Sequence, residues 1–220
     1  MNITEFSSDE YWKLRHKSLL QNPKNVGNKG LTVKQNEDLI GSKAAFVAHL
    51  IGKHLKDNIS ILDAGCGAGE FSKYFFCNKY QYSGFDVSPD AIQQASNVSK
   101  GNFFVSSITD LKLKQKFDLV MCLDVLFHIV DDYMWNKAVE NLAQRVKLNG
   151  CLFIIEYFPG TPSTALHTKW RKTSDYEKKL SDFKLVENIT FQYPHEKLNK
   201  TFLCFKPKNK KQNWFKNFLR

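Results

Sequence analysis

The chain has 220 residues, of which 42% are hydrophobic and 14% aromatic, enough for one α/β domain with a buried core. This size and composition exclude a disulfide-stabilised miniprotein and a chain that is disordered throughout. The net charge of +10 is concentrated at one end, because residues 197–220 hold eight of the 32 Lys and Arg residues and none of the 22 Asp and Glu residues. Residues 1–196 therefore carry only +2, so nucleic acid is not the expected partner of the folded part.

The cysteines and the N-terminus predict the compartment. The five cysteines form no Cys-x-x-Cys pair, and no histidine stands at zinc-ligand spacing from them; they are Cys66, Cys77, Cys122, Cys151 and Cys204. This pattern favours reduced thiols and predicts no metal. The first residues lack the basic and apolar regions of an export signal, and no apolar run approaches the roughly 20 residues of a membrane span. We expect a soluble, cytoplasmic protein.

The N-terminal part reads as helix, loop, helix. Acidic residues at positions 9 and 10 and apolar residues at helical spacing predict an amphipathic helix over 8–20. Proline and glycine among Asn and Lys predict a loop over 22–31, and a second helix is expected over 36–55. We divide the chain into an N-terminal helix and loop (1–35), a main domain (36–206) and a basic, flexible tail (207–220).

Short apolar runs alternate with helical segments from residue 59 onward. The predicted strands are 59–64, 81–86, 102–105, 117–123 and 151–157, and the helices between them are 70–76, 89–96 and 131–146. This alternation predicts βαβ units and a doubly wound, mainly parallel sheet covered on both faces. Segments 183–191 and 200–206 follow each other through a turn too short for a helix, so an antiparallel hairpin is expected at the sheet edge.

A glycine-rich turn follows the first predicted strand. The strand runs directly into Gly65-Cys66-Gly67-Ala68-Gly69, and a helix is expected from Glu70. Alternate glycines permit positive φ and the close approach of a ligand, which predicts a cofactor crevice. A tight strand-to-helix connection without a ligand is the alternative interpretation.

The second strand ends at Asp86, which distinguishes two cofactor classes when combined with the glycine spacing. An acid at this edge accepts hydrogen bonds from ribose hydroxyls, as found in both dinucleotide and S-adenosylmethionine (SAM) sites. Dinucleotide sites use G-x-G-x-x-G, whereas the pattern here is G-x-G-x-G followed by Glu70. Because Glu70 and Asp63 would repel a pyrophosphate but not a cationic sulfonium or amino group, SAM is favoured.

Four segments together resemble the class I, Rossmann-like SAM-dependent methyltransferases. They are 62–69 (LDAGCGAG), 85–88 (FDVS), 117–129 (FDLVMCLDVLFHI) and 149–154 (NGCLFI), and the resemblance spans about residues 36–206. It implies a three-layer αβα sandwich whose seven-stranded sheet has the order 3-2-1-4-5-7-6, with strand seven antiparallel.

The resemblance also implies a set of cofactor-binding residues. Asp63, Gly65 and Gly67 would hold the methionine part of SAM, Asp86 the ribose, and Val87 the adenine. The family often has an acid after strand three, but this chain has Ser107 there. The remaining residues expected around SAM, or its product S-adenosylhomocysteine (SAH), are Cys66, Ile108, Leu123 and Asp124, the last beneath the methionine ammonium.

Acceptor-side candidates come from several segments. His128, just after strand four, is a candidate general base, with a structural role as the alternative. Asp131 and Asp132 fit the capping of the following helix better than a metal site. The residues expected to contact an anionic acceptor are Tyr11, Trp12, Arg15, His16, Lys29, Tyr157, His167 and Arg171. The first helix would then act as a lid; alternatively it is simply attached through its aromatic residues.

We expect direct, in-line methyl transfer, for which no covalent nucleophile is needed. A small-molecule acceptor methylated on oxygen is favoured, with a sugar or phosphate-bearing precursor of a surface glycan placed first on a faint resemblance to bacterial enzymes of such pathways. RNA methylation and a non-catalytic SAM-binding or partner-binding module are the alternatives. The basic, aromatic tail would give at most weak contact with a membrane surface or RNA. The sequence does not decide the oligomeric state.

Overall fold

The computed structural model describes residues 7–18, 28, 30–75, 80–157, 163 and 165–208. The strands are β1 (Ile59–Ala64), β2 (Tyr80–Asp86), β3 (Asn102–Val105), β4 (Phe117–Leu123), β5 (Val146–Tyr157), β6 (Phe183–Phe191) and β7 (Lys200–Pro207). The α-helices are α1 (Ser8–Ser18), α2 (Val33–His54), α3 (Ser72–Phe75), α4 (Pro89–Val98), α5 (Asp132–Gln144) and α6 (Thr173–Lys179). Two 3₁₀ turns, η2 (Ile108–Asp110) and η3 (Leu126–His128), complete the elements.

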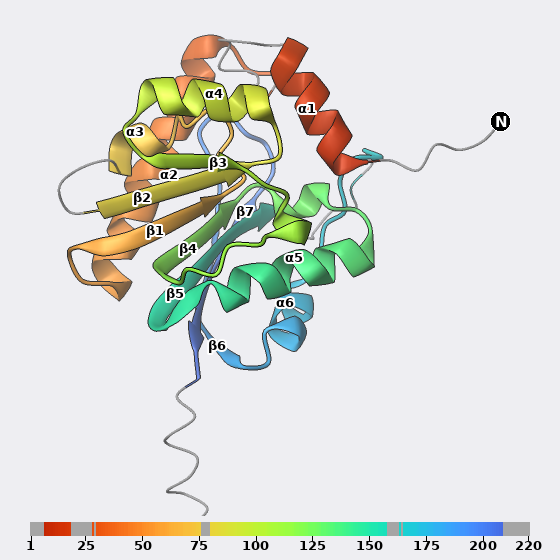
Figure 1. Cartoon of the computed structure of the whole chain (residues 1–220). Coiled ribbons are helices and arrows are strands. Elements are labelled where there is room, and N and C mark those ends of the chain that lie inside the picture. Colours follow the sequence, from red (N-terminus) through yellow and green to blue (C-terminus); the bar gives the residue numbers. More distant parts are fainter. Residues whose placement is uncertain are drawn as a thin grey trace, which may run out of the picture.

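The seven strands form one sheet in the predicted order, β3-β2-β1-β4-β5-β7-β6 (Figure 1). The pairs among β1 to β5 are parallel, while β7 is antiparallel to both β5 and β6. The doubly wound fold and the C-terminal hairpin are therefore confirmed. Because β1, β2 and β4 are parallel neighbours, their carboxyl ends meet at one edge of the sheet, where the polar motif residues stand.

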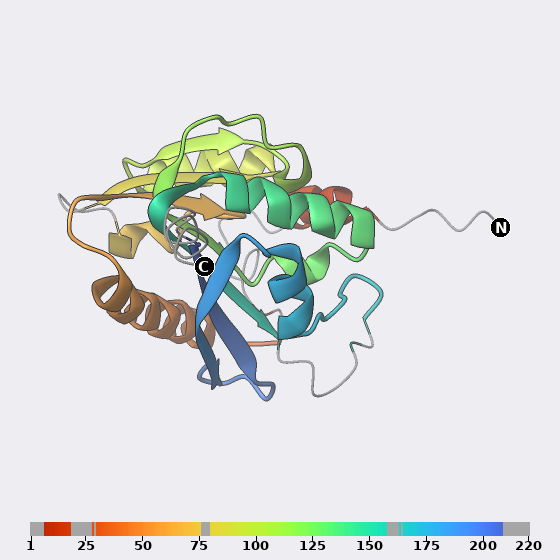
Figure 2. The same cartoon turned by 90° about the horizontal axis from the view of Figure 1, so that it is seen from below.

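Each face of the sheet has its own apolar core. On one face, α5 and α6 pack through residues such as Trp135, Leu142 and Tyr176. On the other face, α2 and α3 contribute residues such as Val47 and Phe75. The two layers lie on opposite sides of the sheet when the molecule is seen from below (Figure 2). Strands buried on both faces explain the continuous apolar runs in the sequence.

Local signals determine where the helices begin. Thr32 and Gln35 form a reciprocal capping box, so α2 begins at Val33, three residues before the predicted start. The Asp131 side chain accepts a hydrogen bond of 2.8 Å from the Met134 N–H at the start of α5, as predicted. The first helix begins at Ser8 as expected and is described to Ser18.

The structure corrects two further helix boundaries and adds one helix. The helix expected from Glu70 begins at Ser72, because a turn follows the glycine loop. The helix expected to reach Val146 ends at Gln144, since Val146 pairs with Phe117 and opens a longer β5. The short α6 was not predicted, because it is polar and buries only Tyr176.

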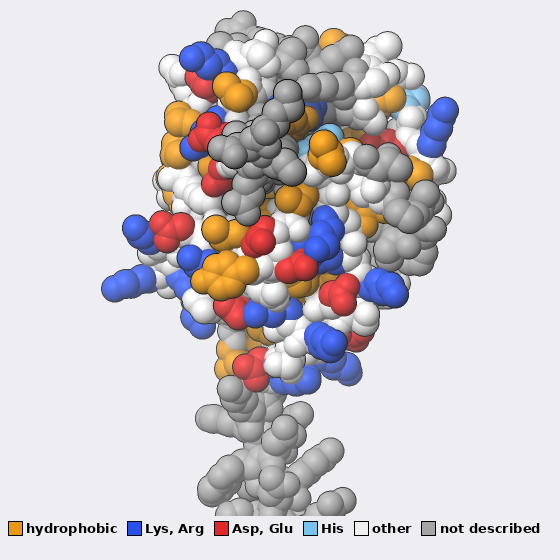
Figure 3. Space-filling view, turned by 90° about the vertical axis from the view of Figure 1, so that its right-hand side faces the viewer, with side chains coloured by type: hydrophobic (Ala, Val, Ile, Leu, Met, Phe, Trp, Pro, Cys, Tyr) orange, Lys and Arg blue, Asp and Glu red, His pale blue; other side chains and the backbone are white. Residues whose placement is uncertain are grey.

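One face of the molecule carries charged side chains of both signs (Figure 3). Acidic and basic side chains are interspersed on the face shown in Figure 3, in agreement with the small net charge of residues 1–196. None of the helices in the described ranges is long and apolar enough to cross a lipid bilayer. The predicted tail lies outside the described residues from 209 onward, so its character and the proposed domain division stay predictions.

Candidate active site

The glycine loop after β1 has the backbone that its sequence predicts. Gly65, Gly67 and Gly69 have φ values of 76°, 53° and 75°, a backbone region that residues other than glycine rarely adopt. The N–H groups of Gly65 and Cys66 both donate to the Phe85 carbonyl at 2.8 and 3.0 Å, which ties the loop to the end of β2. A Cβ at Gly65 would lie 2.6 Å from Val125 Cγ2, so the loop also lies against the end of β4.

Asp86 ends β2 and faces this loop. Its Oδ2 accepts from the Gly67 N–H at 3.0 Å and its Oδ1 from the Ser88 N–H at 2.9 Å. Two backbone donors fix the carboxylate orientation and leave each oxygen a further acceptor position. Burial raises the pKa of Asp86, against the opposing effect of nearby His16. Asp86 is thus a buried, preoriented acceptor.

Asp63, the fifth residue of β1, lies deeper in the same site. Its Oδ2 accepts a short hydrogen bond from the Tyr82 hydroxyl on β2. Burial raises the pKa of Asp63 to about 6, and the Tyr82 hydrogen bond and Lys43 act in the opposite direction. The second carboxylate oxygen can still accept from a ligand, which agrees with the predicted position next to the methionine part of SAM.

Asp124, just after β4, is held between two lysines. Its Oδ2 lies 2.6 Å from Lys43 Nζ of α2, and its Oδ1 lies 2.7 Å from Lys200 Nζ of β7. Burial disfavours the ionised carboxylate, but the two lysines lower the pKa of Asp124 well below its usual value. Glu196 Oε2 lies 3.9 Å from Lys200 Nζ, so with this second carboxylate the four side chains carry no net charge. Asp124 lines the cavity as expected, but its charge is already neutralised, which disfavours the expected contact with an ammonium group.

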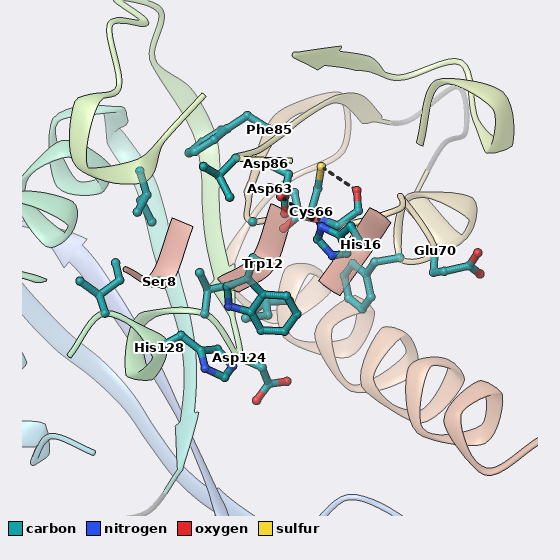
Figure 4. Close-up of a pocket in the computed structure, with 18 of the residues that line it drawn as sticks. Ser8, Trp12, His16, Asp63, Cys66, Glu70, Phe85, Asp86, Asp124 and His128 are labelled. Atoms are coloured by element: carbon teal, nitrogen blue, oxygen red, sulfur yellow. Dashed lines mark hydrogen bonds and ion pairs between the residues drawn. The ribbon is translucent and has the colours of Figure 1, made fainter. Parts of the chain in front are cut away.

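A cavity opens at this edge of the sheet and is covered by α1. Its walls include residues from the ends of β1, β2 and β4, and Trp12 and His16 of α1 form part of its roof. Figure 4 shows Trp12 between His16 and His128, with Asp86 and Asp63 behind them. The first helix therefore covers the site, as the lid interpretation predicts.

His128 stands at the opposite end of the cavity from Asp86. Its Nδ1 lies 3.2 Å from the His167 carbonyl oxygen, so this nitrogen carries the donated hydrogen and Nε2 keeps a lone pair. The Trp12 and His128 ring centroids are 4.8 Å apart in an edge contact. Burial lowers the pKa of His128 to about 3, partly opposed by the His167 carbonyl. The imidazole is therefore neutral at pH 7.

Most of the predicted cofactor residues line this one cavity. They are Asp63, Gly65, Cys66, Gly67, Asp86, Val87, Ile108, Leu123 and Asp124. The exception is Ser107, whose hydroxyl caps the following 3₁₀ turn by accepting from the Thr109 N–H at 3.4 Å. The cavity wall at this point consists of Ser106 and Ile108 instead.

The predicted acceptor residues are more dispersed. Trp12, His16 and His128 line the cavity, and Tyr11 stacks on His167 beside it, with ring centroids 5.0 Å apart. The Arg15 guanidinium lies over the Trp12 ring, 4.8 Å from its centroid.

Two further acceptor candidates face other partners. Arg171 pairs with Asp132 at 3.0 Å and lies over Trp135, in a separate groove beside α5. Tyr157 supports Lys200, whose Nζ is 3.3 Å from the ring centroid. Lys29 lies outside the described residues.

Sequence reasoning missed the charged partners that complete the site. Lys43 lines the cavity, and Lys200 is 2% exposed at the first position of β7. Glu156, next to the end of β5, is 4% exposed and accepts from the Leu126 N–H at 3.1 Å, which fixes the turn that carries His128. A charged residue at the end of an otherwise apolar strand is the signal that marks Glu156 and Lys200.

Residues 36–215 match the sequence model of a family described as "Methyltransferase domain". The chain belongs to this methyltransferase family. The ubiquinone biosynthesis O-methyltransferase of Rickettsia canadensis (strain McKiel) is 26% identical over 161 residues, covering 66% of this methyltransferase and 67% of that protein. The corresponding enzyme of Rickettsia felis is 65% covered, so the chain spans about two thirds of the length of these curated relatives. The tRNA (carboxymethyluridine(34)-5-O)-methyltransferase of Arabidopsis thaliana is 32% identical over 116 residues, covering 52% of this chain and 28% of that protein.

Solved structures share the fold of this methyltransferase. Magnesium protoporphyrin IX methyltransferase from Synechocystis PCC 6803, with bound SAM, has a TM-score of 0.71 at 16% identity and covers 92% of this chain and 99% of that one. N-methyltransferase NodS from Bradyrhizobium japonicum WM9, with SAH, has a TM-score of 0.69 at 18% identity and covers 89% and 99%. The family and the fold confirm the expected enzyme class, a SAM-dependent methyltransferase.

The expected absence of a metal stays a prediction. Across the described ranges, no group of three or more His, Cys, Asp or Glu side chains is arranged to hold a metal ion.

Proposed function

We propose that this methyltransferase binds SAM at the carboxyl ends of β1, β2 and β4 and methylates a hydroxyl group of a small molecule. The observation that carries the proposal is one cavity with two different ends. A fixed carboxylate, Asp86, lies at one end, and the neutral imidazole of His128 lies at the other beneath Trp12.

The residues at the Asp86 end fit the cofactor. Asp86 offers two acceptor positions to a ribose diol, and Gly65 and Gly67 keep the loop free of side chains next to the ligand. Asp63 offers one remaining carboxylate oxygen near the methionine part. When bound, SAM supplies a methyl group activated by its sulfonium charge.

The residues at the His128 end suit a hydroxyl acceptor. Because His128 Nδ1 donates to His167, Nε2 can accept the hydrogen of an acceptor hydroxyl and align its oxygen with the methyl. Burial makes a charged imidazole costly in the resting enzyme. During methyl transfer, however, positive charge leaves the sulfonium, so a proton accepted by His128 adds no net charge to the site.

The acceptor class is supported by one finding. The Rickettsia relatives are described as ubiquinone biosynthesis O-methyltransferases, which supports transfer to oxygen. No observation points to a surface glycan, so the proposal is confined to a small hydroxylated molecule, with acids tested first because the sequence predicts an anionic acceptor. We retain the cytoplasm as the proposed compartment.

RNA methylation is the second candidate, because the Arabidopsis relative is described as a tRNA methyltransferase. Its match covers only about half of this chain, and the face in Figure 3 shows charges of both signs. An RNA substrate would require strong salt dependence of binding.

The test is methyl transfer from radiolabelled SAM to two pools, small hydroxylated acids and total bacterial tRNA. We expect label in the small-molecule pool, with His128→Ala lowering kcat by about 10²-fold or more while SAH affinity stays unchanged. Label in tRNA alone would favour the second candidate. SAM binding without transfer to any acceptor would indicate a non-catalytic module.

A further inference from the structure

His16 of α1 is a buried polar side chain that the proposed chemistry does not use. It is 1% exposed and lines the cavity. Within the described part of the chain, neither of its ring nitrogens has a hydrogen-bond partner. Buried polar side chains are nearly always hydrogen-bonded, so an imidazole that faces a ligand cavity in this way indicates a partner on the ligand.

The position of His16 shows which part of the ligand it would meet. Its Nδ1 lies 3.8 Å from Asp86 Oδ1, too far for a hydrogen bond but close enough for one hydroxyl oxygen to contact both side chains. In Figure 4, His16 lies near Asp86 and Cys66, and Asp124 and His128 lie toward the other end of the cavity. His16 therefore faces the cofactor end of the site.

The chemistry of a ribose diol requires a group of this kind. Each hydroxyl can donate one hydrogen, which the Asp86 carboxylate accepts, and each oxygen then needs a donor. Asp86 cannot supply one, but a neutral imidazole carries one N–H. Burial lowers the pKa of His16, with Asp86 and Asp90 acting against it and Arg15 acting with it, so the ring is available as a neutral donor at pH 7.

We propose that His16 is a ribose-binding residue, which donates its ring N–H to a hydroxyl whose own hydrogen goes to Asp86. This inference rests on the proposed placement of the cofactor at Asp86. From the sequence, His16 is predicted to contact the acceptor, whereas this proposal assigns it to the ribose of the cofactor.

With this role for His16, α1 contacts both ends of the cavity. Trp12 lies one turn before His16 on the same face, with ring centroids 5.6 Å apart, and Trp12 also contacts His128. A ribose bound to His16 therefore holds Trp12 over the acceptor end. Cofactor binding is expected to fix α1 before the acceptor enters.

The test is calorimetric titration with SAH and with its 2′-deoxy and 3′-deoxy analogues. His16→Phe keeps a ring but removes both nitrogens, His16→Asn keeps a side-chain N–H, and His49→Phe, at an exposed position of α2, is the matched control. We expect His16→Phe to weaken SAH binding about five- to tenfold, His16→Asn to restore part of the loss, and His49→Phe to change nothing. Against the deoxy analogue that lacks the contacted hydroxyl, wild type and His16→Phe should differ by less than twofold.

Two other results would overturn the proposal. An equal loss against SAH and both analogues would mean that His16 only packs, and unchanged or tighter SAH binding would mean that it does not contact the ribose. Asp86→Ala tests the placement of the cofactor separately from the role of His16. Unchanged SAH affinity in that variant would reject the cofactor placement itself. As a second readout, SAH should slow amide hydrogen exchange of α1 in the wild type and should slow it less in His16→Phe. Equal thermal midpoints of the two ligand-free proteins would show that the variant is folded.

Discussion

Replacing Glu156 by glutamine should make the stability of the protein much less dependent on pH. Glu156 is 4% exposed on β5, and burial, followed by the charge of Asp124, raises its pKa from 4.5 to about 8. Because the folded-state pKa is the higher one, its contribution to stability is complete below pH 4.5 and is lost as the pH rises through 8. Glu156→Gln removes this titration.

The size of the effect follows from the two pKa values. Compared with low pH, where Glu156 is protonated in both states, ionisation of this group lowers the free energy of unfolding of the wild type by about 2 kcal/mol at pH 6 and by about 5 kcal/mol at pH 9. The free energy of unfolding of Glu156→Gln, relative to that of the wild type, should therefore rise by about 3 kcal/mol between these pH values. Taking the difference at each pH cancels the titration of all other groups.

Urea unfolding followed by tryptophan fluorescence at pH 6 and pH 9 measures this change. Glu177→Gln, at an exposed position of α6, is the control and should show no such growth. If Glu156→Gln follows the wild type in parallel over this range, Glu156 is ionised in the folded protein and the reasoning fails.

Three other substitutions test the site. Asp86→Ala should weaken SAM binding by about 1–3 kcal/mol, because a charged acceptor is lost, and unchanged calorimetric affinity would show that the cofactor binds elsewhere. Gly65→Ala places a Cβ 2.6 Å from Val125 Cγ2 at a φ of 76°, so the thermal midpoint should fall by several degrees; an unaltered midpoint would mean that the loop adapts freely. Lys200→Met removes one of two cations from half-buried Asp124 and should cost about 3 kcal/mol in urea unfolding, whereas full stability would indicate that Lys43 alone suffices.

That the glycine loop and Asp86 meet at one edge of the sheet, the proposed cofactor end, could be predicted because the signals are local in the sequence. Gly65 and Gly67 report backbone conformation directly, and Asp86 ends a strand that the apolar pattern identifies. The parallel order of β1 and β2 then brings the three residues together. Residues whose placement depends only on one strand, one turn and one sheet edge can be predicted without knowing which distant segments of the chain come into contact.

The charged network could not be predicted in this way. Asp124 meets Lys43 and Lys200, which lie 81 and 76 residues away along the chain. Their meeting depends on where α2 packs and on the insertion of β7 beside β5. For the same reason Arg171, which composition assigns to an anionic acceptor, instead meets Asp132 on a neighbouring helix.

The order of the last two strands has a consequence for how the chain folds during synthesis. β6 precedes β7 in the chain, yet β7 occupies the place beside β5, and the strand pairing found for β6 is with β7. As the polypeptide leaves the ribosome, β6 emerges before the strand it pairs with, and the edge of β5 stays open until residues 200–207 are released. Lys200, the first of these residues, brings the second cation to Asp124, so this ion-pair network is completed only after β7 has been released.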